Sequence, residues 1–285
     1  MHIYCTGSGP YTVLIEVGAT ADSDSWRGIQ ETLSQKMRAC TYDRSGHGWS
    51  EPSPGPHDAD TIAGKLHALL DKAAVPRPLI LTGHSAGGLY IRAYARRFSE
   101  EVVGAVMIDS SSPAQVDELP GWRSDWEQDV RKLPAKILKD RLKVWSGWDR
   151  LTGNCHDMPS KELQYLAAEY DAETCRPAYA GEDDNELPYF ELSSKQAARL
   201  ATFGDIPLLI ISRDTHSGKQ KDDLIWDREQ EQFKSLSPRS WRIIAKGSGH
   251  GVHHDRPEVV TTEMERMTAY LQSGPEPPFG TTSVR

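Results

Sequence analysis

Long apolar runs, basic runs and internal repeats are all missing from this sequence, and each absence removes a class of protein. No apolar run approaches the roughly 18 residues of a membrane-spanning helix. The 33 basic and 41 acidic residues give a net charge of −8, and no basic run carries interleaved aromatics, which excludes a nucleic-acid surface. No repeat or low-complexity segment stands out. A chain of 285 residues with these properties is long enough for one α/β domain with an insertion, or for two domains.

The most informative stretch is Gly83–Gly88, which reads Gly-His-Ser-Ala-Gly-Gly and contains the pattern G-x-S-x-G. The apolar run Pro78–Thr82 before it predicts a buried strand, and Leu89–Phe98 after it predicts a helix. Strand, sharp turn and helix form the context in which this pattern marks a nucleophile, because the turn holds the serine Oγ free of the backbone. We therefore predict that Ser85 is a nucleophile. The Ala86 N–H, at the start of the helix, is a predicted donor to an oxyanion.

Apolar runs alternate with helix-like stretches on both sides of this motif. Runs that are apolar throughout are typical of parallel strands whose sheet is covered on both faces. The last 13 residues, 273–285, contain three prolines and two glycines and are expected to form a disordered tail. The other expected strands are Ile3–Cys5, Thr12–Val17, Ala39–Asp43, Val102–Ile108, Pro207–Ser212 and Ser240–Ala245, and the other expected helices are Ser25–Met37, Thr61–Ala74, Leu224–Leu236 and Pro257–Leu271.

Residues 111–204 break this rhythm. They contain helix-like stretches at 160–170 and 193–203. We interpret their tryptophans as packing residues rather than ligand contacts. The acidic run 182–186 is interpreted as a solvated loop rather than a metal site. The tryptophans are Trp122, Trp126, Trp145 and Trp148.

A polar turn follows the third expected strand and contains Asp43, Arg44 and His47. These side chains could be read as catalytic. We prefer the interpretation that they hold the turn together through hydrogen bonds from side chain to backbone, since a partly buried polar turn needs such bonds.

Taken together, these motifs resemble those of enzymes with the α/β-hydrolase fold, in the esterase and peptidase-like branch. The resemblance covers about 1–110 and 205–272. It implies a mostly parallel central sheet with helices on both faces, and residues 111–204 as an inserted helical cap that forms the substrate pocket. The segments that carry it, in the order seen in the family, are Glu16–Gly18, Tyr42–Ser50, Gly83–Gly88 and Gly249–His250.

The resemblance also implies the order nucleophile, acid, base along the chain. His250 lies in a glycine-rich loop after the last strand of the resembling region and is the expected base, with His253 and His254 as rivals. A metal site made of these histidines and Asp255 matches no zinc spacing.

Two aspartates compete for the role of the acid. Most family members carry it after the strand that corresponds to Pro207–Ser212, where Asp214 stands about two residues early; a minority carry it after the preceding strand, where Asp109 stands. We prefer Asp109, because a carboxylate directly after an apolar run is costly to bury unless it pairs with a group such as His250. Asp214 is the alternative acid, and Asp109 could instead cap the next segment.

In this family the loop after the second strand supplies the second oxyanion N–H, usually from a His-Gly-x segment. Val17-Gly18-Ala19 stands at that place, so the Ala19 N–H is the expected donor. The usual histidine is absent, but a backbone donor does not need that side chain.

Four cysteines allow three pairings. The resemblance places the strand of Cys5 antiparallel beside the strand that begins at Cys40, which makes a Cys5–Cys40 disulfide reasonable; Cys155–Cys175 would staple the cap. Four unrelated buried thiols are the alternative. With both bridges we expect a secreted or periplasmic protein, and otherwise a cytoplasmic one.

The resulting expectation is a serine hydrolase that cleaves a carboxylic ester through a Ser-His-Asp triad and an acyl-enzyme, with no cofactor and no metal. Its partner would be a small-molecule ester or amide. Serine at position 85 argues against the epoxide hydrolases and haloalkane dehalogenases of this fold, which use aspartate there. The alternatives are an amide or peptide hydrolase, an acyltransferase with the same triad, and a non-catalytic binding protein of the same fold.

Overall fold

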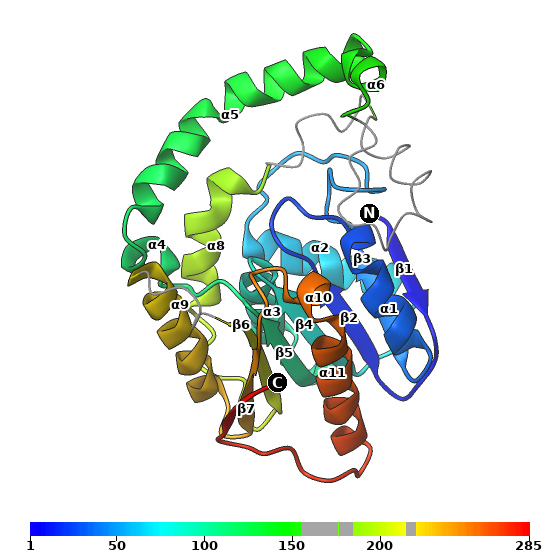
Figure 1. Ribbon diagram of the computed structural model, residues 1–285. Coiled ribbons are helices and arrows are strands. Elements are labelled where there is room, and N and C mark those ends of the chain that lie inside the picture. The colour runs from blue at the N-terminus through cyan, green and yellow to red at the C-terminus, as the bar shows by residue number, and fades with distance from the viewer. Residues whose placement is uncertain (155–175, 177–184, 215–220) are drawn as a thin grey trace.

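An eight-stranded sheet forms the centre of the molecule in a computed structural model that describes residues 1–154, 176, 185–214 and 221–285 (Figure 1). The strand order is β1-β3-β2-β4-β5-β6-β7-β8, and every pair is parallel except β1 with β3. The predicted α/β class with a mostly parallel sheet is confirmed. The strands are β1 (Ile3–Thr6), β2 (Thr12–Glu16), β3 (Arg38–Tyr42), β4 (Leu79–His84), β5 (Val102–Ile108), β6 (Leu208–Arg213), β7 (Ser240–Ala245) and β8 (Thr282–Val284).

The sheet separates two hydrophobic cores. Successive side chains of a strand point to opposite faces, and the buried strands are apolar on both. Leu81 and Met107 therefore belong to one core, while Ile80 and Val106 belong to the other. The first core lies under α2 (Ala59–Lys72), α3 (Gly87–Arg97) and α8 (Phe190–Ala197), and the second under α1 (Arg27–Ser34) and α11 (Pro257–Leu271).

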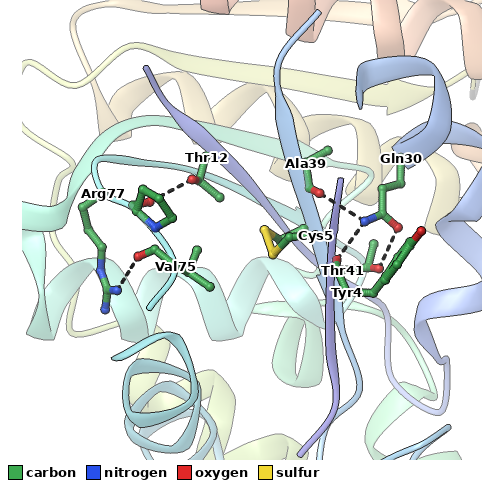
Figure 2. Close-up of a disulfide and its surroundings, with 10 residues drawn as sticks. Tyr4, Cys5, Thr12, Gln30, Ala39, Thr41, Val75 and Arg77 are labelled. Atoms are coloured by element: carbon green, nitrogen blue, oxygen red, sulfur yellow. Dashed lines mark hydrogen bonds between the residues drawn. A yellow bond between two sulfur atoms is a disulfide. The ribbon is translucent and has the colours of Figure 1, made fainter. Parts of the chain in front are cut away.

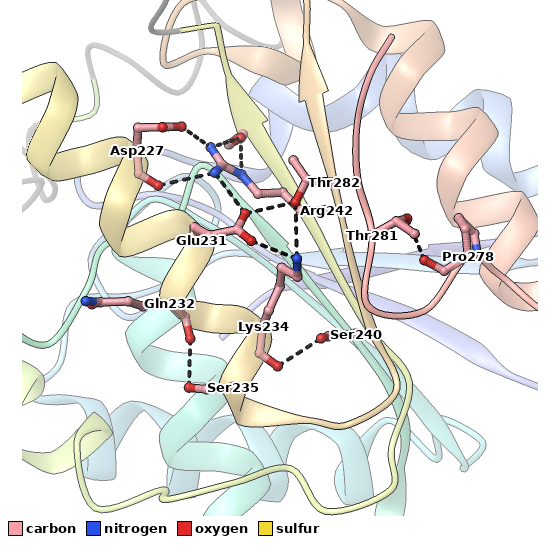
Figure 3. Close-up of polar contacts among 11 residues, drawn as sticks. Asp227, Glu231, Gln232, Lys234, Ser235, Ser240, Arg242, Pro278, Thr281 and Thr282 are labelled. Atoms are coloured by element: carbon pink, nitrogen blue, oxygen red, sulfur yellow. Dashed lines mark hydrogen bonds and ion pairs between the residues drawn. The ribbon is translucent and has the colours of Figure 1, made fainter.

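A buried arginine of β7 holds helix α9 (Lys221–Gln232) against the sheet (Figure 3). Arg242 donates to the Asp227 carbonyl at 3.2 Å and to Glu231 Oε2 at 3.3 Å, and its guanidinium also donates to Ser212 Oγ on β6. A charge that is 2% exposed needs such partners. The arrangement fixes α9 at the edge of the site described below.

A helical region follows β5. It consists of α4 (Gln115–Glu118), α5 (Trp122–Trp145) and α6 (Trp148–Thr152), and α5 extends away from the body with α6 at its far end (Figure 1). Trp122 and Trp126 stack on each other with ring centroids 6.2 Å apart and pack against the first core, whereas Trp145 and Trp148 are exposed. The packing interpretation therefore holds for the first two tryptophans only. The helix expected at 160–170 lies outside the described residues, and none of the helices in the described ranges is long and apolar enough to cross a bilayer.

The expectation of a disordered tail over 273–285 is wrong in its last part. Thr282–Val284 forms β8, which adds parallel to β7 with Arg242 opposite Thr282. The Gly280 N–H donates to the Ser240 carbonyl at 2.6 Å, and the Phe279 ring packs against Trp241. Prolines prevent a helix here, but they leave a three-residue strand free to pair with a sheet edge.

The predicted Cys5–Cys40 disulfide is present, because the two cysteines face each other in the antiparallel register of β1 and β3 (Figure 2). Gln30 on α1 holds the same two strands. Its amide donates to the Tyr4 carbonyl at 2.8 Å and to the Ala39 carbonyl at 3.1 Å. The expected Cys155–Cys175 pair lies outside the described residues.

Candidate active site

Ser85 occupies a strained turn between β4 and α3. Its φ is +52°, in the left-handed region that non-glycine residues rarely adopt. The backbone around it is fixed, since the Ser85 N–H donates to the Ile108 carbonyl and the Gly88 N–H donates to the Ser85 carbonyl. A Cβ on Gly87 would lie 2.4 Å from the Glu16 carbonyl oxygen, so only glycine allows this close approach. The predicted strand, turn and helix are confirmed, and they present the serine at the carboxyl end of β4.

Three strand ends bring Ser85, His250 and Asp109 together. His250, in the loop after β7, places Nε2 3.0 Å from Ser85 Oγ and Nδ1 2.6 Å from Asp109 Oδ2. Because a carboxylate only accepts, Nδ1 carries the proton and Nε2 is left to accept from the serine hydroxyl. This arrangement can withdraw the hydroxyl proton of Ser85 as its oxygen attacks an electrophile.

Asp109 is fully buried, and both of its carboxylate oxygens have donors. Oδ1 accepts from the Trp226 indole at 2.8 Å and from the Arg213 N–H at 3.1 Å, while Oδ2 faces His250. An unpaired carboxylate would be expensive to bury at this position. Trp226 also places its ring edge-on to the His250 imidazole, with centroids 5.7 Å apart. Trp226 could not be predicted from the sequence, because a tryptophan on a helix carries no local sign of a partner 117 residues away.

Asp214, the alternative acid, has a different position in the loop. It is partly exposed, and its Oδ2 accepts from the Gly247 N–H at 3.1 Å, while its own N–H donates to the Ser248 carbonyl. These bonds tie the end of β6 to the loop that carries His250. The imidazole nitrogen of His250 that faces away from Ser85 is Nδ1, and it lies 2.6 Å from Asp109 Oδ2.

Two neighbouring histidines, His84 and His253, are buried beside His250, whereas His254 is exposed. His84 Nε2 lies 2.9 Å from the His250 carbonyl oxygen, and burial, followed by the charge of His250, lowers the pKa of His84 to about 4. A neutral His84 must therefore donate from Nε2 to that carbonyl, which holds the His250 loop. His253, a rival base, stacks instead on Trp26 with centroids 4.1 Å apart, and burial lowers its pKa well below the usual range. Asp255 accepts from the Gly249 N–H at 2.7 Å.

The two expected oxyanion donors lie on loops that flank Ser85. Ala86 directly follows Ser85 and stands at the N-terminus of α3. Gly18, the residue before Ala19, is close enough to the nucleophile that a Cβ on it would lie 3.3 Å from Ser85 Cβ. Arg44 donates to the Gly18 carbonyl at 2.6 Å and to the Val17 carbonyl at 3.0 Å. The arginine thus holds the backbone that leads into Ala19.

Arg44 is part of a buried charge cluster with Glu16 and Glu186. Its Nη1 lies 2.7 Å from Glu16 Oε1, and its Nε donates to Glu186. Burial, which outweighs the guanidinium, raises the pKa of Glu16 to about 7. Burial opposes ionisation of Glu186 too, but there Arg44 prevails and the pKa of Glu186 is lowered. The Tyr90 hydroxyl donates to Glu186 at 3.1 Å.

Two interpretations of the polar residues change as a result. Glu186 is 3% exposed, so the solvated-loop interpretation of 182–186 is wrong for this residue; residues 182–184 lie outside the described ones. Asp43 does hold its turn, since it accepts from the backbone N–H groups of Ser23 and Trp49 at 2.8 and 3.1 Å. Arg44 does more, because it also reaches the loop beside the nucleophile.

Comparisons with known proteins agree with this architecture. The chain is 25% identical over 254 residues to the uncharacterized protein YqjL of Bacillus subtilis, covering 89% of this chain and 82% of that protein. A thermophilic esterase from Thermogutta terrifontis has the same fold, with a TM-score of 0.65, 18% identity and coverage of 95% and 93% of the two chains. A bromoperoxidase from Bacillus anthracis gives a TM-score of 0.65 at 19% identity over 93% and 94%. The sequence model of the alpha/beta hydrolase family matches residues 13–263, and the chain belongs to that family.

Proposed function

We propose that this protein is a serine hydrolase that cleaves carboxylic esters. Ser85 Oγ attacks the acyl carbonyl carbon while its proton passes to His250 Nε2. The Ala86 and Ala19 N–H groups donate to the oxyanion, and the alcohol leaves with the proton from His250. Water, deprotonated by His250, then attacks the acyl-enzyme, releases the carboxylic acid and restores the serine.

One observation carries the proposal. A single imidazole lies within hydrogen-bond distance of a strained serine at one nitrogen and of a buried carboxylate at the other. A serine with a purely structural role would not need its hydroxyl to face a base. The geometry of Ser85 and His250 matches that required of an activated nucleophile. Within the same proposal, residues 1–110 and 205–272 form the catalytic core and 111–204 the cap. The helical region at 115–152 and the return of the chain at Glu186 support that division.

The decisive experiment uses a fluorophosphonate probe and a p-nitrophenyl ester. We expect the wild type to be labelled and to hydrolyse the ester, and Ser85→Ala to lose labelling and at least about 10³-fold of kcat/KM. Ser237→Ala is the control, because Ser237 lies just before β7, at the end of the strands away from Ser85, where its hydroxyl donates to the Ile206 carbonyl. It should retain both activities.

The same assays separate the other possibilities. Faster cleavage of aminoacyl anilides than of esters would replace the ester proposal by an amide hydrolase, and transfer to an added alcohol or amine in preference to water would indicate an acyltransferase. A folded wild type that neither labels nor hydrolyses would leave a binding protein. The Cys5–Cys40 disulfide supports the further proposal of an oxidising compartment. Free thiols at both positions in protein isolated without reductant would contradict it.

A further inference from the structure

We infer that Arg44 is a positioning residue that fixes the direction of the Ala19 N–H, and that Glu186 holds Arg44 in place. The inference rests on the proposed hydrolase function, because it concerns the oxyanion donors of that reaction. It assigns a role to the arginine of the polar turn and to a glutamate from the far side of the helical region.

The first step is the set of bonds that Arg44 makes. Nη1 and Nη2 donate to the carbonyls of Val17 and Gly18, two consecutive residues, and Nη1 also donates to Glu16. The two Nη groups of the guanidinium therefore hold the backbone that leads directly into Ala19. A lysine could not make this set, because its ammonium is a single point of charge.

The second step follows from peptide geometry. The Gly18 carbonyl and the Ala19 N–H belong to the same planar trans peptide, in which they point in opposite directions. With the carbonyl held by Arg44 at 2.6 Å, the N–H is directed away from the guanidinium. Gly18 approaches Ser85 so closely that an added Cβ would lie 3.3 Å from Ser85 Cβ. The held peptide therefore presents its donor on the side of the nucleophile.

Arg44 is itself held in place by Glu186. Its Nε donates to Glu186, which also accepts from the Tyr90 hydroxyl at 3.1 Å. The neighbouring Asn185 amide donates to the Ser45 carbonyl at 3.1 Å. Two adjacent residues after the helical region thus clamp two adjacent residues of the polar turn. Because a buried guanidinium with one partner removed is poorly compensated, loss of the Glu186 charge should loosen the grip on the loop.

Substitutions of Arg44 test the assignment against a matched arginine. Arg44→Met removes the fork and Arg44→Lys keeps only the charge. Since loss of one oxyanion donor costs roughly 10²–10³ in kcat, we expect a fall of about 10²-fold for Arg44→Met, about tenfold for Arg44→Lys, and KM within about threefold. Arg92 is the control, because it is also buried and donates to the Ala197 and Leu200 carbonyls, away from the loop. Arg92→Met should lower thermal stability and leave kcat close to that of the wild type.

Two further measurements separate positioning from general damage. Binding of a trifluoromethyl ketone, which forms an oxyanion on Ser85, should weaken by the same factor as kcat falls, while the pH midpoint of kcat/KM, set by the base, stays in place. Glu186→Gln, which keeps the shape, should lose about five- to tenfold in kcat.

A folded Arg44→Met protein with unchanged kcat would overturn the inference, as would an equal loss of kcat in Arg92→Met. If Arg44→Met does not fold, Arg44→Lys and Glu186→Gln decide in the same way. An inactive, unlabelled wild type would instead show that the proposed hydrolase function fails.

Discussion

The two sides of the candidate site are supported by different chemistry. On the side of the proposed oxyanion donor Ala19, called the oxyanion side, a buried cluster of Arg44, Glu16 and Glu186 holds the preceding loop. On the side of the base and acid, the supports are groups that are neutral at physiological pH. They are the Trp226 indole and the Arg213 N–H on Asp109, and the His84 imidazole on the His250 carbonyl.

The difference determines which side responds to pH. The pKa of Glu16 is raised to about 7 by burial, so the charge of the oxyanion-side cluster changes in the neutral range. An indole and a backbone N–H do not titrate, and the pKa of His84 is lowered to about 4 by burial. The supports of the base-and-acid side should therefore stay unchanged across the pH range in which the other side changes its charge.

The largest effect should come from breaking the base-and-acid side at its carboxylate. Asp109→Asn should lower kcat/KM by about 10³–10⁴-fold, because the amide oxygen stays with the Trp226 and Arg213 donors, and the amide NH2 then faces Nδ1 and favours the wrong imidazole tautomer. Asp214→Asn keeps an oxygen that can accept from the Gly247 N–H and should stay within about twofold of the wild type. Steady-state kinetics on one ester decide. An equal loss in both variants, or a larger one in Asp214→Asn, would move the acid to Asp214.

A smaller effect should follow from removing one donor to that carboxylate. Trp226→Phe deletes the N–H that lies 2.8 Å from Asp109 Oδ1 and keeps a ring against His250. A hydrogen bond to a charged group contributes about 1.5–3 kcal/mol, so we expect kcat to fall by about 10- to 100-fold. Trp241→Phe is the control, since Trp241 is as buried and its indole N–H has no hydrogen-bond partner in the described structure. If both variants lose kcat alike, ring packing rather than the indole bond is responsible.

Part of the fold and of the candidate site could be predicted from the sequence. Ser85 stands in a short motif between a strand and a helix, and local pattern was enough to name it, whereas His250 was named from the order of residues that the family resemblance implies. Asp109 could be preferred because a carboxylate at the end of an apolar run needs a buried partner. The order of strands and helices followed from apolar runs, and the disulfide from the pairing that the family implies.

The supports of the site could not be predicted, because their partners are distant in sequence. Glu186 lies 142 residues from Arg44 and sits in an acidic run that looks solvated. Trp226 lies 117 residues from Asp109. β8 was missed because three prolines dominate the composition of the tail, whereas its pairing depends on the free edge of β7. Contacts of this kind leave no periodicity and no local motif.

The pH dependence of the oxyanion side should be visible in stability. A carboxyl whose folded pKa is raised from 4.5 to about 7 binds more protons in the folded state, so the free energy of unfolding falls as pH rises through that window. Glu16→Gln mimics the protonated form and should remove up to about 3 kcal/mol of this fall. Denaturant unfolding at pH 5, 6, 7 and 8 measures it: the variant should gain stability over the wild type as pH rises.

Glu229 on α9 provides the matched control, because burial, followed by Glu118, raises its pKa to about 7 as well. Glu229→Gln should flatten the stability profile in the same direction. Only Glu16→Gln should also raise kcat above pH 7, by about two- to threefold, because it removes a negative charge behind the oxyanion loop. Equal kinetic effects of the two variants would mean that the cluster does not act on that loop.

The smallest effect on turnover should come from the Cys5–Cys40 disulfide, which contacts neither side of the site. The bridge closes a loop with a sequence separation of 35, and chain-entropy arguments give about 4 kcal/mol for a loop of that length. The double variant Cys5→Ala, Cys40→Ala should therefore unfold several degrees lower. Its kcat at 25 °C should stay within about twofold of the wild type, because the Gln30 amide still joins β1 to β3. A fall in kcat as large as that of Trp226→Phe would mean that the edge of the sheet helps to place the oxyanion loop, and the division into two separately supported sides would then fail.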